Sequence, residues 1–290
     1  MSFQQVFSTG KKVLSFEFFP PKEEANLEQT LTKIQELSVL QPDFMTVTYG
    51  AGGGTRALTA RMVEFITQSL KCNAVAHLTC VDHSIDEIDT LLNTFKSVGV
   101  KHILALRGDP QGGKTKFAPH PNGFASARDL VQYIKARGDF SIAVAGYPET
   151  HPEALSAEAD IRYLKEKVDA GAELIITQLF FEAETYFKFL EDTRKIGIAT
   201  PITPGIIPIN NLDQIERFTQ RCAASIPPTL LSSLRALQND PEGTAEFCKN
   251  YAIELCRMLL KGGAPGIHLY TLNNSTLAVP IIQALKPDFF

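Results

Sequence analysis

The sequence has no excess of positive charge, no long hydrophobic run and no low-complexity segment, and each absence excludes a class of protein. Its 28 lysines and arginines are outnumbered by 32 aspartates and glutamates, which gives a net charge of −4. Because a basic surface holds nucleic acid through its phosphates, we expect no nucleic-acid partner. No run of about 18 apolar residues occurs, so we predict no membrane-spanning helix. The amino-terminal stretch MSFQQVFSTGKK lacks the apolar segment of a signal peptide.

Cysteine is scarce, and no two cysteines form a C-x-x-C pair. An odd number of unpaired cysteines indicates reduced thiols in a reducing compartment. Together with the missing signal peptide, this predicts a cytoplasmic protein. The five cysteines are Cys72, Cys80, Cys222, Cys248 and Cys256.

The glycine-rich stretch VTYGAGGG, residues 47–54, lacks the spacing of the two common phosphate-binding loops. Counted from Gly50, the third glycine of a G-x-G-x-x-G fingerprint would fall on Thr55. No Gly-Lys pair follows, which excludes the P-loop. By itself the stretch predicts only a flexible connection from a strand to a helix.

Short apolar stretches alternate with longer amphipathic segments along the whole chain. The first amphipathic segment, NLEQTLTKIQELSVL, repeats leucine or isoleucine every three or four residues, as one face of a helix does. Apolar strands joined by helices predict a parallel sheet covered on both faces, and eight such units favour a closed (β/α)₈ barrel, an α/β TIM barrel. The predicted strands are Val13–Pro20, Phe44–Gly50, Ala74–Cys80, His102–Asp109, Ser141–Tyr147, Leu174–Phe181, Pro201–Pro208 and Gly266–Leu272.

Several predicted helices have recognisable ends. Ser84 stands three residues before Glu87, as in a capping box. The segment 221–263 is too long for one crossover, so we expect additional helices between the seventh helix and the eighth strand. No interdomain linker or internal repeat is visible, which predicts a single barrel domain over residues 1–290. Glycines stand where helices should end, at Gly99, Gly138, Gly171 and Gly197.

Polar residues stand late in the predicted strands or directly after them, where barrels place their active sites. Because the carboxyl ends of all strands meet at one rim, we expect these side chains to converge. A Schiff-base enzyme would need a lysine late in a strand, and none is found there. The residues are Glu17, Thr48, Tyr49, His77, Thr79, Arg107, Asp109, Tyr147, Gln178 and Asn273.

Glu17 lies between Phe16 and Phe18 in SFEFFPPK. A carboxyl group that faces apolar rings loses hydration, which disfavours its charged form and suits it to donate a proton. The functional interpretation is a general acid. The alternative is a structural ion pair with Lys22 or Arg107.

The stretch LALRGDP ends the fourth predicted strand with three residues suited to a ligand. Gly108 allows close approach of the backbone, Arg107 can hold a phosphate with two hydrogen bonds, and Asp109 can accept from a flat ring edge. A local pair between Arg107 and Asp109 is the alternative. His77 lies inside the apolar stretch AVAHLTC, where a satisfied core histidine is a commoner outcome than a ligand contact. Tyr147 and His151, on a proline-rich loop, can lie against a cofactor.

Taken together and in order, these stretches resemble the methylenetetrahydrofolate reductase family. The resemblance covers essentially the whole chain and is carried by FEFFPPK, VTYGAGGGTR, HLTC, HILALRGDP, YPETHPEA, DAGAELIITQLFF, PGIIPI and HLYTLN. It implies a (β/α)₈ barrel that binds FAD at the carboxyl-terminal rim and assembles as a homo-oligomer. It also implies hydride transfer from NADH or NADPH to FAD and then to 5,10-methylenetetrahydrofolate, by a ping-pong route. The product, 5-methyltetrahydrofolate, feeds methionine synthesis.

The resemblance assigns roles to residues of this sequence. Glu17 matches the acid that opens the folate ring to an iminium, and Asp109 matches a carboxylate near flavin and pterin. Gln178 matches a folate-binding residue, while Phe218 and Gln214 match contacts to substrate or nicotinamide. For FAD, the matching residues are Thr48, His77, Arg107, Gly108, Asp109, Ala125, Tyr147, His151, Asp160 and Lys167.

The chain departs from the family pattern at three positions. Asn274 stands where the family usually has an arginine, which leaves one anionic contact unassigned. Tyr163 and Phe124 replace other residues near the flavin and are not carried over as polar contacts. We expect no carboxyl-terminal regulatory domain within these 290 residues.

A metal-dependent barrel hydrolase is the alternative function. It would use Glu17, His77, Asp109 and His151 as ligands. Such enzymes usually place two histidines two residues apart on an early strand, and FEF contains none. We therefore expect no metal.

Overall fold

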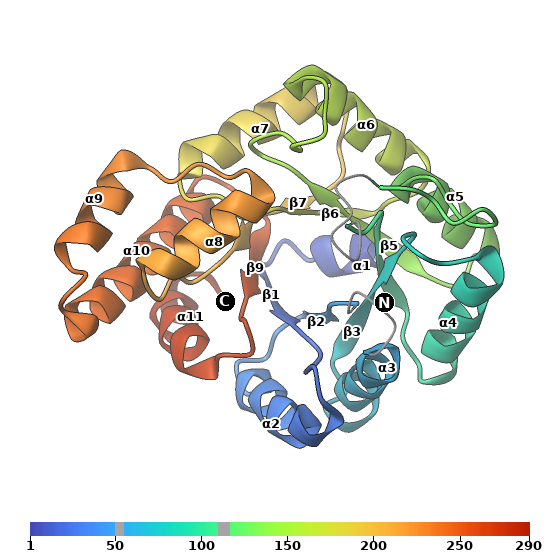
Figure 1. Ribbon diagram of the computed structural model, residues 1–290, viewed down its shortest axis with the longest axis horizontal. Helices are drawn as coiled ribbons and strands as arrows, with labels where there is room; N and C mark the ends of the chain where they lie inside the picture. Colours follow the sequence, from blue (N-terminus) through green and yellow to red (C-terminus); the bar gives the residue numbers. More distant parts are fainter. Residues whose placement is uncertain (50–54, 110–116) are drawn as a thin grey trace.

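The computed structural model describes residues 1–49, 55–109 and 117–290, and in this part of the chain all strands belong to one parallel sheet. The sheet curls into a ring that helices surround (Figure 1). The expectation for the glycine-rich segment 50–54 lies outside the described residues. The strands are β1 (Val13–Phe18), β2 (Phe44–Val47), β3 (Asn73–Thr79), β4 (His102–Leu106), β5 (Ser141–Gly146), β6 (Leu174–Thr177), β7 (Ile202–Thr203), β8 (Gly205–Ile206) and β9 (Gly266–Tyr270).

The predicted (β/α)₈ barrel is confirmed, with one strand divided in two. The seventh predicted strand forms β7, which pairs with β6, and β8, which pairs with β9. Pro204 separates them because it has no N–H to donate to a ladder. Its carbonyl still accepts from the His268 N–H at 3.0 Å, and the Gly205 N–H donates to Thr177 Oγ1 at 2.9 Å. These two hydrogen bonds keep the ring of strands connected where β7 and β8 are separated.

The outer helices follow the strands in sequence order (Figure 1). Ser84 and Glu87 form the predicted capping box. All four glycines expected at helix ends have positive φ, between 73° and 125°. A π-helical turn, Phe65–Ser69, continues α3, and a 3₁₀ turn, Glu24–Asn26, precedes α2. The α-helices are α1 (Phe3–Phe7), α2 (Leu27–Ser38), α3 (Arg56–Glu64), α4 (Ile85–Ser97), α5 (Ala127–Arg137), α6 (Ala157–Asp169), α7 (Ala183–Lys195), α8 (Leu212–Cys222), α9 (Pro228–Ala236), α10 (Pro241–Lys261) and α11 (Ser275–Phe289).

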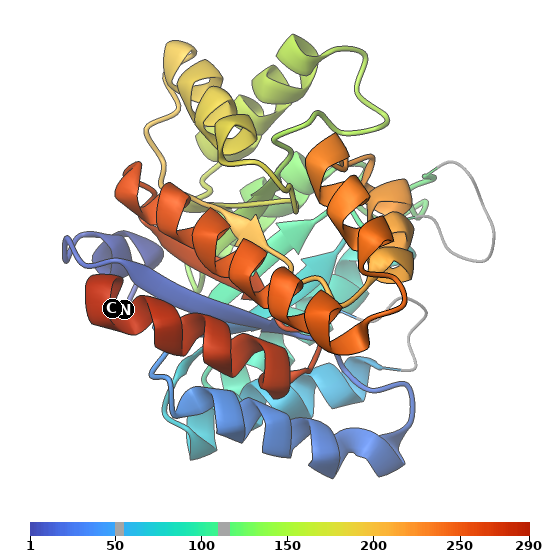
Figure 2. The ribbon, with the colours of Figure 1, turned by 90° about the vertical axis from the view of Figure 1, so that its left-hand side faces the viewer.

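The additional helices expected in segment 221–263 are present. Three helices, α8, α9 and α10, connect β8 to β9. The long α10 packs against α7 and α11 and so fills the seventh place in the outer ring, as Figure 2 shows for α10 and α11. The preceding pair, α8 and α9, pack on each other near the rim, over a separate cluster that includes Leu179, Ile207 and Leu230.

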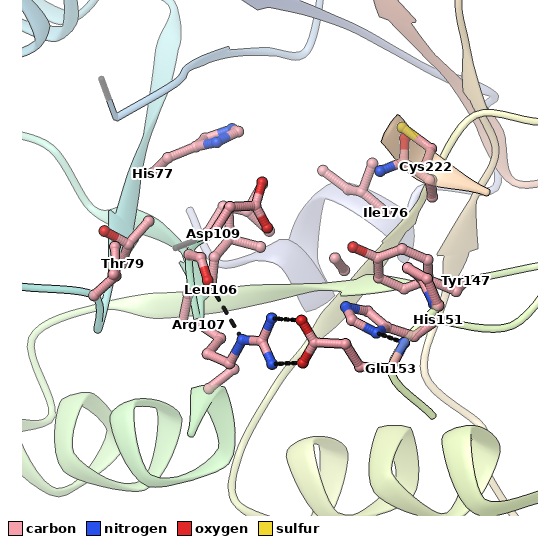
Figure 3. Close-up of a pocket in the computed structure, with 18 of the residues that line it drawn as sticks. His77, Thr79, Leu106, Arg107, Asp109, Tyr147, His151, Glu153, Ile176 and Cys222 are labelled. Carbon is pink, nitrogen blue, oxygen red and sulfur yellow. Dashed lines mark hydrogen bonds and ion pairs between the residues drawn. The ribbon is translucent and has the colours of Figure 1, made fainter. Parts of the chain in front are cut away.

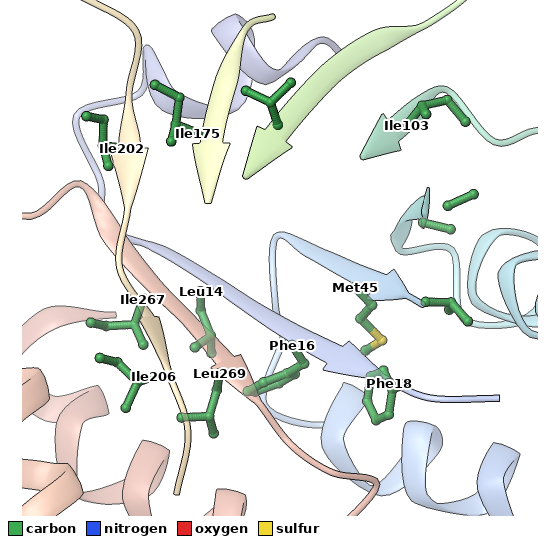
Figure 4. Close-up of a cluster of buried hydrophobic side chains, with 14 of the residues drawn as sticks. Leu14, Phe16, Phe18, Met45, Ile103, Ile175, Ile202, Ile206, Ile267 and Leu269 are labelled. Atoms are coloured by element: carbon green, nitrogen blue, oxygen red, sulfur yellow. The ribbon is translucent and has the colours of Figure 1, made fainter. Parts of the chain in front are cut away.

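The strands have an outer and an inner apolar face. On β1, Leu14, Phe16 and Phe18 belong to the large cluster between strands and helices (Figure 4). Val13 belongs instead to the cluster inside the barrel. Since successive strand residues point to opposite faces, Ser15 and Glu17 also point inward.

A short helix that the sequence did not reveal closes the amino-terminal end of the barrel. Ser2 and Gln5 form a capping box around α1, and Phe3 is fully buried in the inner cluster. The Phe3 N–H donates to Ser141 Oγ at 2.9 Å, and His102 Nε2 lies 2.8 Å from the Met1 carbonyl oxygen. Five residues are too few to show a helical period, which is why sequence patterning missed this helix.

The buried His102 predicts a loss of stability in mild acid. Burial lowers its pKa from 6.5 to about 4, so between these values the unfolded chain binds a proton that the folded protein does not. The unfolding free energy should therefore fall as pH drops from 6.5 to 4. A His102→Gln variant should lose less stability over this window, as measured by urea unfolding. His77 contributes in the same direction, and parallel curves for the two proteins would contradict the prediction.

Gly266 should not tolerate a side chain, because β1 runs too close to it. A Cβ atom there would lie 2.1 Å from the Val13 carbonyl oxygen and 2.8 Å from the Val13 nitrogen. Both atoms are backbone and cannot move without opening the β1–β9 ladder. We expect Gly266→Ala to lower the unfolding free energy by about 2 kcal/mol. If urea titrations show that the unfolding free energy falls by less than about 0.5 kcal/mol, the β1–β9 ladder can adjust to the added methyl group and the prediction is wrong.

Candidate functional site

A cavity of about 1200 Å³ opens at the carboxyl-terminal ends of the strands. Figure 3 shows side chains from several strands and rim loops pointing into it. Ligand pockets usually measure about 300–1,000 Å³, so this one has room for a large ligand or for two molecules together. Its position agrees with the location of active sites in (β/α)₈ barrels.

Every residue to which the family resemblance assigns a role lines this cavity except Gln214. Of the polar residues expected at the rim, only Asn273 does not line it, because its side chain bonds the backbone of Phe19. The Gln214 side chain accepts from the Asn210 N–H at 2.7 Å, at the start of α8. It faces a small hollow that it shares with Phe181, Ile209 and Phe218. The residues that do line the cavity are Glu17, Thr48, His77, Arg107, Gly108, Asp109, Ala125, Tyr147, His151, Asp160, Lys167, Gln178 and Phe218.

Glu17 lies at the end of β1, at the inner wall of the cavity, and is only 6% exposed. Its Oε2 atom accepts from Thr46 Oγ1 at 3.4 Å and lies 3.4 Å from His77 Nε2 and 3.5 Å from His268 Nε2. Within the described residues, no lysine or arginine forms an ion pair with it, so the alternative of a structural pair with Lys22 or Arg107 is wrong.

The expectation that Phe16 and Phe18 face the Glu17 carboxyl is also wrong. Both rings point to the outer face of β1, among Leu14 and Met45 (Figure 4). The alternation of strand side chains requires this, because residues 16 and 18 cannot share a face with residue 17. Burial among barrel strands, rather than contact with aromatic rings, keeps water from this carboxyl.

His77 is a buried histidine next to Glu17, and burial lowers its pKa to about 4, although Glu17 opposes that change. The imidazole is therefore neutral near pH 7. In the described structure, neither its Nε2 atom nor Thr79 Oγ1 makes a hydrogen bond, though both are buried. Unsatisfied buried polar groups are uncommon in native proteins, so a ligand in the cavity is the natural partner for both.

Arg107 pairs with Glu153 across the mouth of the cavity (Figure 3). The pair is bidentate, with 3.0 Å between Arg107 Nη2 and Glu153 Oε1, and the hydrogen bonds raise the pKa of Arg107. The guanidinium also lies 4.9 Å above the centre of the Phe117 ring. The alternative of a local Arg107–Asp109 pair is therefore wrong. Asp109 is exposed and makes no hydrogen bond to any described residue.

The loop after β5 joins the cavity to α6. The ring centres of Tyr147 and His151 are 4.6 Å apart, and the His151 N–H donates to Asp160 Oδ2 at 2.8 Å. Lys167 lies in the last turn of α6 and is 8% exposed. Its amine donates to the Ala145 carbonyl at 2.6 Å. Burial lowers its pKa to about 8, partly opposed by Asp160.

These groups fit the flavin nucleotide that the family resemblance implies. Lys167 is a buried cation without an ion-pair partner among the described residues, which suits an anionic or strongly accepting group of a ligand. His77 and Thr79 have unused hydrogen-bonding capacity. Tyr147 and His151 offer ring faces and edges beside them.

Sequence reasoning missed several cavity residues. Tyr270 lines the wall and donates to the Thr177 carbonyl at 2.6 Å. Strand alternation from Gly266 could have found it, because His268 and Tyr270 share the inner face of β9. Glu153 was missed because nothing in YPETHPEA shows that it pairs with Arg107, 46 residues away. Phe117 and Cys222 also line the cavity.

The metal-dependent hydrolase finds no support in the arrangement of side chains. In the part of the chain that the structure describes, no three histidines, cysteines or carboxylates lie together as a metal site would require. Glu17 and His77 are close, but Asp109 and His151 do not join them as ligands. Among the described helices, none combines the length and apolar character that crossing a membrane needs.

Comparison with known proteins gives matches along almost the whole chain. Residues 2–286 match the family model described as methylenetetrahydrofolate reductase. A rice protein (Oryza sativa subsp. japonica) called "Probable methylenetetrahydrofolate reductase (NADH)" is 41% identical over 97% of this chain and 49% of its own length. The 5,10-methylenetetrahydrofolate reductase of Escherichia coli is 40% identical over 95% of this chain and 91% of its own length.

The chain thus spans about half the length of the plant relatives and nearly all of the bacterial one. Among solved structures, an uncharacterized protein from Clostridium thermocellum superposes with a TM-score of 0.62. It is 17% identical, with 98% of this chain and 97% of that chain covered, and its description says that it binds two copies of 5-methyl-5,6,7,8-tetrahydrofolic acid. At that identity, the likeness shows the barrel fold alone. From the match to the family model and the two relatives near 40% identity, the chain belongs to the methylenetetrahydrofolate reductase family.

Proposed function

We propose that this chain reduces 5,10-methylenetetrahydrofolate to 5-methyltetrahydrofolate, with FAD as bound cofactor and NADH as hydride donor. Membership of the family supports the reaction. The names of the rice and maize relatives specify NADH, which supports that donor over NADPH. The size of the cavity supports a flavin and a second molecule in one site.

The observation that carries the proposal is a buried carboxyl at the wall of this cavity that has no lysine or arginine partner among the described residues. Within residues 1–49, 55–109 and 117–290, the Glu17 carboxyl has only long contacts, to Thr46 and to two histidines. A neutral carboxyl there can give its proton to the bridging nitrogen of the folate, whose ring then opens to an iminium. Asp109, exposed in the cavity, can accept from the amino edge of the pterin and favour the cationic iminium.

Residues on β3, on β4 and around α6 would hold the flavin. His77 Nε2 and Thr79 Oγ1 would form hydrogen bonds with the flavin. The Lys167 amine would donate to an anionic or strongly accepting group of the flavin nucleotide. Arg107, fixed by Glu153, would lie along one side. When bound, FAD supplies a carrier that accepts hydride from NADH and passes it to the folate. Gln178 would bind folate, and Phe218 would pack against folate or nicotinamide in turn.

The visible absorption spectrum of the purified protein tests the proposal. Under anaerobic conditions, NADH should bleach the flavin band and methylenetetrahydrofolate should restore it. Parallel runs with NADPH should bleach more slowly at equal concentration. A protein that shows no flavin band even after added FAD would overturn the proposal. Bleaching by NADH without recovery by methylenetetrahydrofolate would support the flavin and contradict the proposed folate reaction.

Two further properties belong to the same proposal. We expect a homo-oligomer and a cytoplasmic location, as the family resemblance and the cysteine usage predict. Light scattering after gel filtration measures the first. Cell fractionation measures the second.

A further inference from the structure

Behind Glu17, Ser15 and His268 form a chain of polar contacts that does not line the cavity. Both are fully buried, and they are paired in the register of β1 and β9. Ser15 Oγ lies 2.9 Å from His268 Nδ1, and His268 Nε2 lies 3.5 Å from Glu17 Oε2. The imidazole thus connects a buried hydroxyl to the carboxyl.

The Ser15 hydroxyl contacts Nδ1 of His268, and the direction of that contact decides which ring nitrogen carries the proton. This hydroxyl has one hydrogen to donate, and its two possible acceptors are His268 Nδ1 at 2.9 Å and the Ile267 carbonyl at 3.4 Å. The shorter contact is to Nδ1. An imidazole that accepts at Nδ1 carries its proton on Nε2 when neutral. With the hydroxyl donating to Nδ1, the Nε2–H of His268 faces Glu17 Oε2, 3.5 Å away.

In that arrangement two donors converge on one oxygen of Glu17, because the Thr46 hydroxyl also donates to Oε2, at 3.4 Å. The other oxygen, Oε1, makes no hydrogen bond to any residue that the structure describes. A neutral carboxyl carries its proton on only one oxygen. Because Oε2 already faces two donors, a proton on Oε2 would oppose them, whereas a proton on Oε1 would not.

We propose that Ser15 and His268 are positioning residues that keep the acidic proton of Glu17 on Oε1, the oxygen open to a substrate. This rests on the proposed function. In the proton transfer, the Oε1–H bond breaks, an N–H bond forms at the bridging nitrogen of the folate, and the electron pair stays on the carboxylate. His268 and Thr46 then stabilise the new charge through Oε2.

The groups around Glu17 allow this role because, among the residues that the structure describes, none of them is a fixed cation. The titratable groups that face it are His77 from β3 and His268 and Tyr270 from β9. A lysine or arginine at this place would hold the carboxyl ionised, whereas hydroxyl and imidazole donors stabilise it without a permanent charge.

The tautomer of His268 can be measured on the protein without cofactor. Nitrogen-15 spectra of protein labelled at histidine distinguish the Nε2–H tautomer, the Nδ1–H tautomer and the imidazolium. The His268 signal is identified by its absence from a His268→Gln variant. We expect the Nε2–H tautomer at pH 7 in the wild type and a mixture of tautomers in Ser15→Ala. The Nδ1–H tautomer or the imidazolium in the wild type would overturn the proposal.

The half-reactions give a second and independent test. His268→Leu removes the donor, and we expect reoxidation of the flavin by methylenetetrahydrofolate to slow about 10-fold to 100-fold. His268→Gln keeps an N–H near the position of Nε2 and should recover most of that loss. Bleaching by NADH should change less than about 3-fold in either variant, since no proton of Glu17 is needed there.

His102→Gln is the matched control, because His102 is also buried inside the barrel but contacts the Met1 carbonyl at the opposite end. It should change neither half-reaction. Equal rates in His268→Leu and His268→Gln, or equal slowing of both half-reactions in His268→Leu, would overturn the positioning role. A wild type that never binds flavin would instead refute the proposed function, and the tautomer measurement would still decide the role of Ser15.

Discussion

Replacing Glu17 by glutamine should abolish folate reduction while leaving the reduction of the flavin by NADH nearly intact. The amide keeps the size of the side chain and the contact to Thr46 but has no acidic proton. Loss of a general acid typically costs about 10²-fold to 10⁴-fold in rate, and the cost falls only on the step that uses the proton. Rapid mixing with NADH and then with methylenetetrahydrofolate measures the two rates separately.

The reaction with NADH is the internal control for Glu17→Gln. If both half-reactions fell together, Glu17 would contribute to flavin binding or to folding, and the general-acid role would be wrong. If neither fell, another group would supply the proton. Thermal unfolding of the variant would separate a folding defect from a lost chemical group.

Replacing Lys167 by methionine should strip the flavin from the protein. The amine is buried, donates to the Ala145 carbonyl and has no ion-pair partner among the described residues, so its charge is available to a ligand. Losing a hydrogen bond to a charged group costs about 1.5–3 kcal/mol, which corresponds to roughly 10-fold to 100-fold in affinity. Fluorescence titration of the flavin-free protein with FAD gives the dissociation constant.

Lys165 provides the matched control on the same helix. It lies two residues earlier on α6, toward solvent, where it pairs with Asp169. Lys165→Met should leave the affinity for FAD within about 2-fold, since exposed ion pairs contribute little. Equal affinities in the two variants would show that Lys167 does not contact the flavin.

The affinity for FAD should also depend on pH, and more strongly in the wild type than in Lys167→Met. Because burial lowers the pKa of Lys167 to about 8, the amine loses its charge in the unliganded protein as pH rises through that value. FAD binding should weaken from pH 7 to pH 9 in the wild type and change less in Lys167→Met. Identical pH dependence in both would assign the effect to another group.

The strand starts could be predicted because each begins with a run of apolar residues directly after a turn. The predicted Phe44, His102, Ser141, Leu174 and Gly266 all begin strands in the structure. The strand ends were placed too far along, as for Leu174–Phe181, where β6 ends at Thr177. Rim loops in this chain are as apolar as the strands, because Leu179 and Phe181 pack under α8 and α9.

The chemistry of the site was visible in the sequence, but the partners of its residues were not. Glu17 and His77 could be found from their places late in strands β1 and β3, and Lys167 from the family pattern. Whether Arg107 would pair with Asp109, Glu17 or neither depended on Glu153, which folding brings to it from another loop. The same holds for Ser15 and His268, which are 253 residues apart in sequence and meet only when the barrel closes.

The sequence by itself determined the barrel and the set of polar side chains at its rim. Local periodicity sets the order of strands and helices, and parallel strands must end at one edge. Only the tertiary structure decided which oxygen of Glu17 accepts hydrogen bonds, that Lys167 is buried against the Ala145 carbonyl, and which way the phenylalanines of β1 point. Those outcomes depend on contacts between strands that are distant in sequence, and no pattern within a single segment encodes them.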